Sequence, residues 1–469
     1  GDLQRPSLYR HQVGAMNTSS TAAPRRPARR ELLEGPIAAT LLRKTLPVIG
    51  GMIAMISFNL VDTWFISRLG TEPLAAVSFT FPVVFTVISL AIGLGIGTSA
   101  VVARQLGRGE FDTVRRRATD AALLALVVGL LMTLIGLASL EPLFRLLGAD
   151  DLLMPHIRDY MGVWYFGAAA VIIPRVLNSL LRAHSNTATQ GVMMALAAVC
   201  NVLLDWLLIF GAGPLPAMGV SGAALATVLS WGLMAVALLF QRELRGLFDL
   251  AGLTRHGLLV SWRELGRIAG PAALTSVFTP LAMGLLTRIV AGHGHDAVAG
   301  FGVGTRIEAF AQIAVLGLSM TLSPLVSQNA GAGQYVRVRR AIFGCFAFVL
   351  AWQLLVWGVL QVLAPWLVGA YAEGEAVGEV LRHFLWLVPL GLGAQGVVIL
   401  AVSSCNALHR PSRAMRLSVV RLFVLSVPLA WLGGRLADTT GVFAGMLTAN
   451  LLMALVAWWQ IRVVLARYR

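Results

Sequence analysis

Twelve runs of about 20 apolar residues follow one another along the 469 residues of this chain. A helix of about 20 residues crosses the roughly 30 Å of hydrocarbon in a bilayer, and lipid cannot pair the backbone polar groups of a less regular segment. With 57% hydrophobic and 13% charged residues, the chain is too apolar for a soluble fold. We therefore predict an all-α polytopic membrane protein with helices near residues 43–67, 73–103, 115–140, 155–181, 189–212, 217–240, 264–291, 296–328, 338–366, 378–405, 414–434 and 440–465.

Basic and acidic residues lie in different loops of the chain. The loops after the even-numbered helices carry arginines such as Arg115, Arg116, Arg117 and Arg182, whereas the odd-numbered loops carry acids such as Glu72 and Asp150. Because cytoplasmic loops are enriched in Lys and Arg, we expect a multi-pass membrane protein with both termini in the cytoplasm. The bacterial inner membrane is the expected location. This sorting explains the formal charge of +15, and we expect no nucleic-acid partner.

Residues 1–38 are rich in Arg, Pro, Ala and Ser. That composition favours a disordered cytoplasmic tail. A cleaved transit peptide has a similar composition, and Met16 is an alternative start, so both alternatives stay open.

The chain repeats itself at a shift of 224 residues, which takes Pro47 to Pro271 and Gly107 to Gly331. Six helices per repeat is an even number, so the two halves share one orientation and are related by an axis along the membrane normal. We expect an N-lobe at 39–240, a cytoplasmic linker at 241–263 and a C-lobe at 264–469. Two parallel lobes around a central cavity favour alternating-access transport, although duplication also occurs in passive channels and membrane enzymes.

Two carboxylates lie inside predicted helices of the first half. Asp62 lies in the first helix, and Asp205 follows Asn201 by one turn on the same face of the fifth helix. Thr227 lies in the neighbouring sixth helix of the same half, from which its hydroxyl can reach the same site. Ionisable groups at membrane depth are costly, and two neighbouring carboxylates can hold a proton or bind Na⁺. The structural alternative is that Asp62 pairs with Arg68 and that Asp205 only hydrogen-bonds Asn201.

Other residues of the apolar segments are secondary candidates. Pro47 weakens the first helix and is a candidate hinge, with a static kink as the alternative. Glu308 in the eighth helix is a second-rank coupling or substrate group. His293, His295 and Asp296 lie in a short loop without further ligands, so we expect no metal site and no cofactor.

These features resemble the multidrug and toxic compound extrusion family. The resemblance rests on the Asn-Leu-Val-Asp-Thr motif around Asp62, the Asn201–Asp205 pair and the Gly219-Val-Ser-Gly segment that leads to Thr227. The glycine-bearing loop after the second helix and the corresponding loop after the eighth helix also support the resemblance. The pattern is most similar to the DinF-like branch.

The resemblance implies export of organic, often cationic or amphipathic drugs in exchange for H⁺ or Na⁺. In the DinF-like branch, matches to Asp62, Asn201, Asp205 and Thr227 form the cation site, and the helix-1 proline matches Pro47. Asn178 and Met194 match positions that line the N-lobe drug cavity, and Met55 is expected to join them. The C-lobe acids of the NorM-like branch are replaced by Thr279 and Gln395, which disfavours a C-lobe Na⁺ site.

We therefore predict a secondary active antiporter that is not an enzyme and acts as a monomer in the lipid bilayer. One alternative is a flippase for lipid-linked oligosaccharide or peptidoglycan precursors. Such a protein needs a cationic cavity for pyrophosphate, for which the sequence offers only Arg175, Arg306 and Arg421. A second alternative, a membrane-embedded enzyme, needs clustered carboxylates for a metal or a Ser-His set, and neither pattern occurs in the sequence.

Overall fold

The apolar runs fold as helices, as predicted. The computed structural model describes residues 32–211, 216–248, 255–371 and 374–467, and every regular element in these ranges is helical. The first 31 residues of the predicted tail lie outside the described residues. The elements are α2 (Ile37–Ser67), α3 (Thr71–Arg108), α4 (Phe111–Leu146), α5 (Met154–Phe166), α6 (Ala168–Ala183), α7 (Thr187–Phe210), α8 (Val220–Leu239), α9 (Arg255–Ala291), α10 (His295–Ala311), α11 (Ile313–Gly331), α12 (Tyr335–Tyr371), α13 (Glu375–Leu387), η1 (Pro389–Gly391), α14 (Leu392–Ala407), α15 (Pro411–Val419), the π-helix η2 (Val420–Ser426) and α16 (Val427–Ala466).

Several membrane segments are bent. Within the described ranges, nine helical segments are each long and apolar enough to cross a bilayer, and two bent pairs, α5 with α6 and α10 with α11, qualify together. The last segment, Pro411–Ala466, turns sharply at Ala437 and Asp438, and Asp438 has φ 49° and ψ −143°, a strained backbone conformation outside the left-handed helical region. Dividing that segment at the turn and counting each bent pair once yields the twelve crossings that the sequence predicts.

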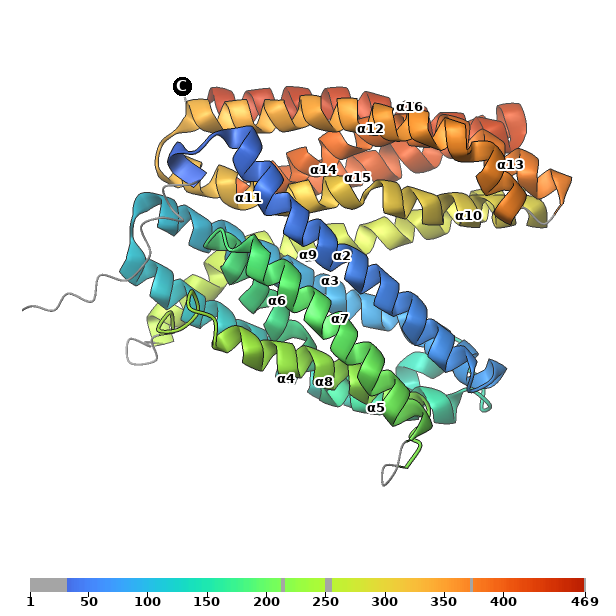
Figure 1. Cartoon of the computed structure of the whole chain (residues 1–469), viewed down its shortest axis with the longest axis horizontal. Helices are drawn as coiled ribbons and strands as arrows, with labels where there is room; N and C mark the ends of the chain where they lie inside the picture. The colour runs from blue at the N-terminus through green and yellow to red at the C-terminus, as the bar shows by residue number, and fades with distance from the viewer. Residues whose placement is uncertain (1–31, 212–215, 249–254, 372–373, 468–469) are drawn as a thin grey trace, which may run out of the picture.

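The helices form two lobes, and the first helix of each lobe packs against both of them (Figure 1). In α2, Leu41 belongs to the apolar core of the second lobe and Phe65 to that of the first. In α9, Leu265 packs in the core of the first lobe and Leu286 in that of the second. Helix α9 begins at Arg255 and so takes up part of the predicted linker at 241–263.

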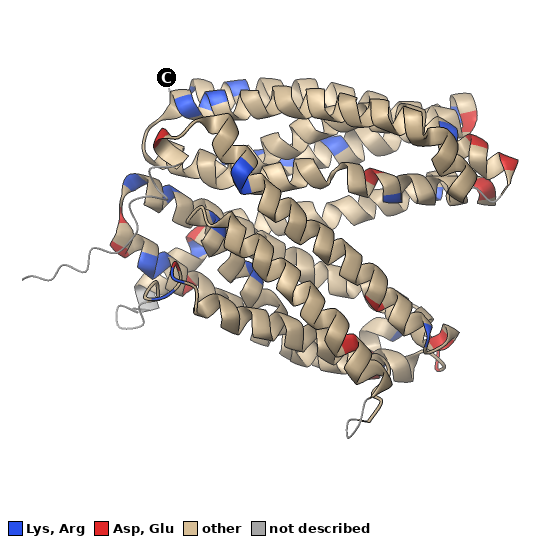
Figure 2. Cartoon of the chain, in the orientation of Figure 1, with Lys and Arg blue, Asp and Glu red and all other residues tan. Residues whose placement is uncertain are grey.

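The two lobes touch at the end of the molecule that carries the C-terminus and diverge towards the other end (Figure 1). We call the touching end the closed end. There, Gln328 Nε2 of α11 donates to the Ala183 carbonyl of α6 at 2.6 Å, and His409 Nε2 lies 3.2 Å from the Ala100 carbonyl of α3. Figure 2 shows Lys and Arg gathered at the closed end and most acids of the second lobe at the opposite end.

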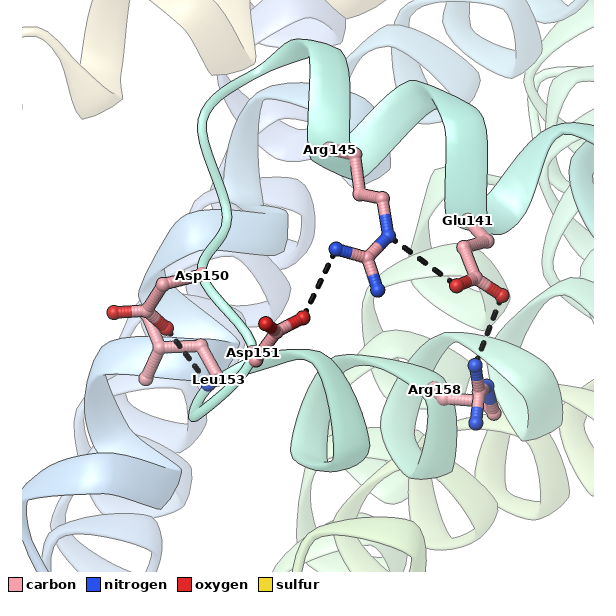
Figure 3. A network of polar contacts seen from close by, with 6 residues as sticks. All are labelled: Glu141, Arg145, Asp150, Asp151, Leu153 and Arg158. Carbon is pink, nitrogen blue, oxygen red and sulfur yellow. Dashed lines mark hydrogen bonds and ion pairs between the residues drawn. The ribbon is translucent and has the colours of Figure 1, made fainter.

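An exposed ionic network lies at the opposite end of the first lobe (Figure 3). Arg145 of α4 contacts Glu141 at 3.2 Å and Asp151 at 3.0 Å, and Arg158 of α5 contacts Glu141 at 2.9 Å. Asp150 accepts a hydrogen bond from the backbone N–H of Leu153, close to the start of α5. Such exposed pairs stabilise little by themselves, so we assign this network to fixing the α4–α5 loop.

Candidate functional site: a carboxylate cluster and a cavity between the lobes

The structure brings the four predicted polar residues of the first lobe together. Asp62 comes from α2, Asn201 and Asp205 from α7, and Thr227 from α8. Asp205 and Asn201 are 0% and 1% exposed. With the Asn201 amide oriented so that both of its groups are satisfied, its nitrogen donates to Asp205 Oδ2 at 2.8 Å and its oxygen accepts from the backbone N–H of Thr227 at 3.2 Å. We call these four residues the carboxylate cluster.

The carboxyl groups of Asp62 and Asp205 lie within hydrogen-bonding range of each other. Two carboxyl groups can share a hydrogen bond only when one of them carries a proton. Among the described residues, Asp62 Oδ1 and Asp205 Oδ1 are buried without a hydrogen-bond partner. The cluster therefore has oxygen atoms available for a proton or for a small cation. Arg68 stacks on Trp64 at 4.8 Å, which is a partner other than Asp62.

Close packing of α2 on α7 holds the cluster in place. A Cβ atom at Gly191 of α7 would overlap the carbonyl of Pro47, and one at Gly51 of α2 would lie 2.9 Å from the Gly191 carbonyl. Two helices that meet through glycines can bring their polar side chains into contact. Helix α2 runs unbroken through Pro47.

Tyr160 of α5 also belongs to this region, although no sequence pattern predicts it. Its phenol is buried and interacts electrostatically with both Asp62 and Asp205. A tyrosine in an apolar helix has no sequence signal that separates it from an ordinary core residue, so only the packing of α5 against the cluster identifies it.

A cavity of about 570 Å³ lies between the lobes, separate from the carboxylate cluster. Met55 of α2, Asn178 of α6 and Met194 of α7 line it, beside methionines, serines and threonines of both lobes. Met55 and Asp62 are seven residues apart on α2, as are Met194 and Asn201 on α7, and two helical turns span about 10 Å. The same two helices thus contact both the cavity and the cluster.

Three arginines also line the cavity: Arg175 and Arg182 of α6 and Arg421 of η2. The distribution of arginines predicts Arg182 in a cytoplasmic loop, and the flippase alternative assigns Arg306 to the cavity. Both assignments are wrong. Arg182 lies in the last turn of α6 and lines the cavity, whereas Arg306 is exposed and is not among the lining residues.

Glu308 lies in the second lobe, apart from the carboxylate cluster. Its Oε1 accepts from Gln395 Nε2 at 3.4 Å, and Gln395 Oε1 in turn accepts from Asn450 at 3.3 Å. Arg421 is the charged residue that interacts electrostatically with Glu308. Glu308 is 8% exposed, and its Oε2 is buried without a hydrogen-bond partner among the described residues.

Comparisons with known proteins agree with this architecture. A family model described as MatE matches residues 47–207 and 271–432, two segments whose starts are separated by the same 224 residues as the internal repeat. The chain is 37% identical over 437 residues to a protein of Shewanella oneidensis named FAD transporter, covering 92% of this chain and 96% of that relative.

More distant relatives carry other names. The probable multidrug resistance protein NorM of Thermotoga maritima is 24% identical and covers 92% of this chain and 95% of its own length. The multidrug export protein MepA of Staphylococcus aureus is 23% identical, with coverages of 90% and 93%. The crystal structure of a mutant of the Vibrio cholerae MATE transporter VcmN superposes with a TM-score of 0.86 at 31% identity, covering 94% of this chain and 98% of that one.

Proposed function

Because this chain belongs to the MatE (multidrug and toxic compound extrusion) family of membrane transporters, we propose that it is a secondary active antiporter. In this proposal an organic compound leaves the cell in exchange for H⁺ or Na⁺. The observation that carries the proposal is the carboxylate cluster, in which the buried Asp205 lies against the half-buried Asp62 inside one lobe of a two-lobed transporter.

The proposed coupling runs through α2 and α7. Cation entry changes the charge of Asp62 and Asp205, and a carboxylate that gains a proton or Na⁺ no longer repels its neighbour. Helix α2 then shifts near Pro47, and the shift alters the cavity wall at Met55 and Met194. Cation and substrate each need a different affinity for the two states of the transporter, which makes their binding reciprocal.

We further propose that the closed end faces the cytoplasm of a bacterial cell, in keeping with its arginines. In that orientation the structure corresponds to an outward-facing state, and rocking of the lobes at 39–240 and 264–469 would open the closed end. The transporter would act as a monomer. Glu308 is retained as a second-rank coupling or substrate group.

The substrate class needs its own test, since the names of the relatives range from FAD to multidrug export. The resemblance favours organic cations and amphipathic drugs, whereas the relative at 37% identity makes a flavin dinucleotide a candidate. Both classes should therefore be assayed side by side.

The proposal is tested in proteoliposomes with H⁺ and Na⁺ gradients imposed separately. Wild type should move substrate when one of the two gradients is present. Asp62→Asn and Asp205→Asn should lose gradient-driven transport and still bind substrate, because each removes one carboxylate of the cluster. Asp296→Asn, in an exposed position of the other lobe, is the matched control and should behave as wild type. Normal driven transport by both cluster variants would overturn the proposal.

A further inference from the structure

We infer that the cavity binds an organic phosphate, whose negatively charged group is held by Arg175 and Arg182 of the first lobe and Arg421 of the second. This inference rests on the proposed function and names its substrate class. We call these three residues the arginine triad.

The charged side chains of the cavity wall are all positive. Of the described residues that line the cavity, those of the triad are the charged ones, and no lining residue is an acid. Arginine stays protonated in proteins, so the wall carries three positive charges. An organic cation entering this cavity would meet repulsion, whereas a phosphate would meet the planar donors that fit its oxygen atoms.

The triad is also short of partners. In the described part of the chain, none of the three guanidinium groups forms an ion pair with a carboxylate within 4.0 Å, and Glu308 interacts with Arg421 only beyond that distance. Arg175 donates to the Val171 carbonyl at 2.7 Å and stacks on Trp231 at 4.3 Å, which leaves further N–H donors of its guanidinium for a ligand. Buried charges normally have a partner, and a bound anion would supply one.

The internal repeat argues that the triad is not part of the shared scaffold. At the shift of 224 residues, Arg175 and Arg182 fall on Ile399 and Asn406, and both of these neutral residues line the same cavity. Arg421 lies in a π-helix, a rare element that is frequent at functional sites. Packing of the repeat therefore does not require these arginines, and a ligand explains them better.

The rest of the wall suits an aromatic compound with hydrogen-bond donors. Trp231, Met55 and Met194 offer an apolar surface for a ring system. Asn178 Oδ1 and Asn406 Oδ1 are buried acceptors without a partner among the described residues. They would accept from ring N–H groups or sugar hydroxyls. An aromatic ring, a polar linker and a phosphate are the parts of a nucleotide-like molecule.

The triad also joins the two lobes. Arg175 and Arg182 move with α6 and Arg421 moves with η2, so one phosphate or pyrophosphate group held by all three would bridge the lobes. Rocking of the lobes would separate the arginines and weaken the site. Phosphate chemistry occurs both in soluble nucleotides and in lipid-linked pyrophosphates, and the experiment has to distinguish these sources.

Riboflavin, FMN and FAD provide a matched probe series, because they share one ring system and carry no phosphate, one phosphate and a pyrophosphate. Binding is measured by calorimetry on the full chain in detergent, without any ion gradient. We expect FAD and FMN to bind at least about tenfold more tightly than riboflavin, and ethidium to bind weakly. Arg175→Gln, Arg182→Gln and Arg421→Gln should each raise the Kd for FAD at least about tenfold.

Arg306→Gln is the matched control, since this exposed arginine lies outside the cavity lining. Arg421→Lys keeps the charge and should recover part of the affinity, which separates loss of the site from loss of the fold. Equal binding of riboflavin and FAD, or triad variants that match Arg306→Gln, would overturn the inference. A polyprenyl pyrophosphate that binds the triad more tightly than FAD would support the phosphate site and assign it to a lipid-linked substrate.

The binding assay and the gradient assay fail separately. Phosphate-dependent binding without gradient-driven transport would support the phosphate site at the triad and contradict the antiport proposal. Gradient-driven efflux of ethidium without phosphate-dependent binding would support antiport and contradict the phosphate site.

Discussion

Gly107 of α3 faces the backbone of Gln328 in α11, and a Cβ atom at this glycine would overlap the Gln328 carbonyl. The repeat produces the same contact in reverse, since Gly331 of α11 faces the carbonyl of Arg104 in α3. Gly331 is the repeat equivalent of Gly107, and Gln328 that of Arg104. The two lobes therefore close on each other through a pair of glycines related by the internal repeat.

Gly107→Ala and Gly331→Ala should each open the closed end. Overpacking at a tight contact costs about 1–3 kcal/mol, which corresponds to a shift of about 5- to 150-fold in the population of the closed arrangement. Spin labels at Asp112→Cys and Val336→Cys, exposed positions related by the repeat, report the separation of the lobes once Cys200, Cys345 and Cys405 are replaced. Gly344→Ala, where a methyl group meets open space, should leave the distance unchanged. Unchanged distances in both interface variants would contradict this account of closure.

The closed end should loosen in acid because of His409. This residue lies between α14 and α15, outside the membrane segments, and contacts the Ala100 carbonyl. Burial, together with the positive charges of Arg104 and Arg108 on α3, lowers the pKa of His409 to about 4 from its ordinary 6.5. Opening would separate the ring from Arg104 and Arg108, so the open arrangement should bind the proton more readily.

Closure is consequently strongest above pH 6.5 and weakens as the pH falls from 6.5 towards 4. The spin-label distance should lengthen over that window in wild type. His409→Gln keeps an N–H donor for Ala100 without the titration, and its distance should be independent of pH. A variant that follows the wild-type profile would assign the transition to another group.

Loss of the Asn201 amide should weaken cation binding. Hydrogen bonds to charged groups contribute about 1.5–3 kcal/mol, so Asn201→Ala should raise the cation concentration needed for half-maximal transport by about 10- to 150-fold. Transport measured against pH and against Na⁺ reveals the shift. Ser221→Ala, on an exposed hydroxyl of α8, is the control. A cation dependence that matches wild type would show that Asn201 does not contribute to cation binding by the carboxylate cluster.

The spans of the bundle could be predicted from hydropathy because lipid forces each apolar run into a helix. The carboxylate cluster could be predicted as well, since Asn201 and Asp205 share a face and an acid at membrane depth needs a partner. Hydropathy does not report which lobe a helix packs on. The crossing of α2 and α9 between the lobes depends on contacts between residues far apart in the chain, such as Leu41 with the second core.

The position of Arg182 could not be predicted from the distribution of charges among the loops. This residue directly follows the predicted helix at 155–181, so the distribution of arginines predicts that it lies in a cytoplasmic loop. In the structure α6 is tilted by its 47° bend against α5, and the side chain of Arg182 lines the cavity. Loop charge predicts orientation, but the inward direction of one side chain depends on the bend of its helix.

Replacement of the α2 proline should slow transport without abolishing binding. Pro47→Ala restores a backbone hydrogen bond and stiffens α2 between the closed end and Asp62. The expected result is a lower kcat for transport with an unchanged Kd for substrate. Pro82→Ala changes an exposed proline inside α3 and serves as the control. Wild-type kcat in Pro47→Ala would rule out the hinge.

The most direct test of the account is the cation flux that accompanies substrate. A pH dye or a Na⁺ dye inside proteoliposomes would record cation movement when substrate is added to one side. The account predicts that substrate exchange drives counterflow of one cation in wild type and that this counterflow is lost in Asp62→Asn and in Asp205→Asn. Substrate transport without cation counterflow, or counterflow that persists in both variants, would contradict the assignment of coupling to the carboxylate cluster.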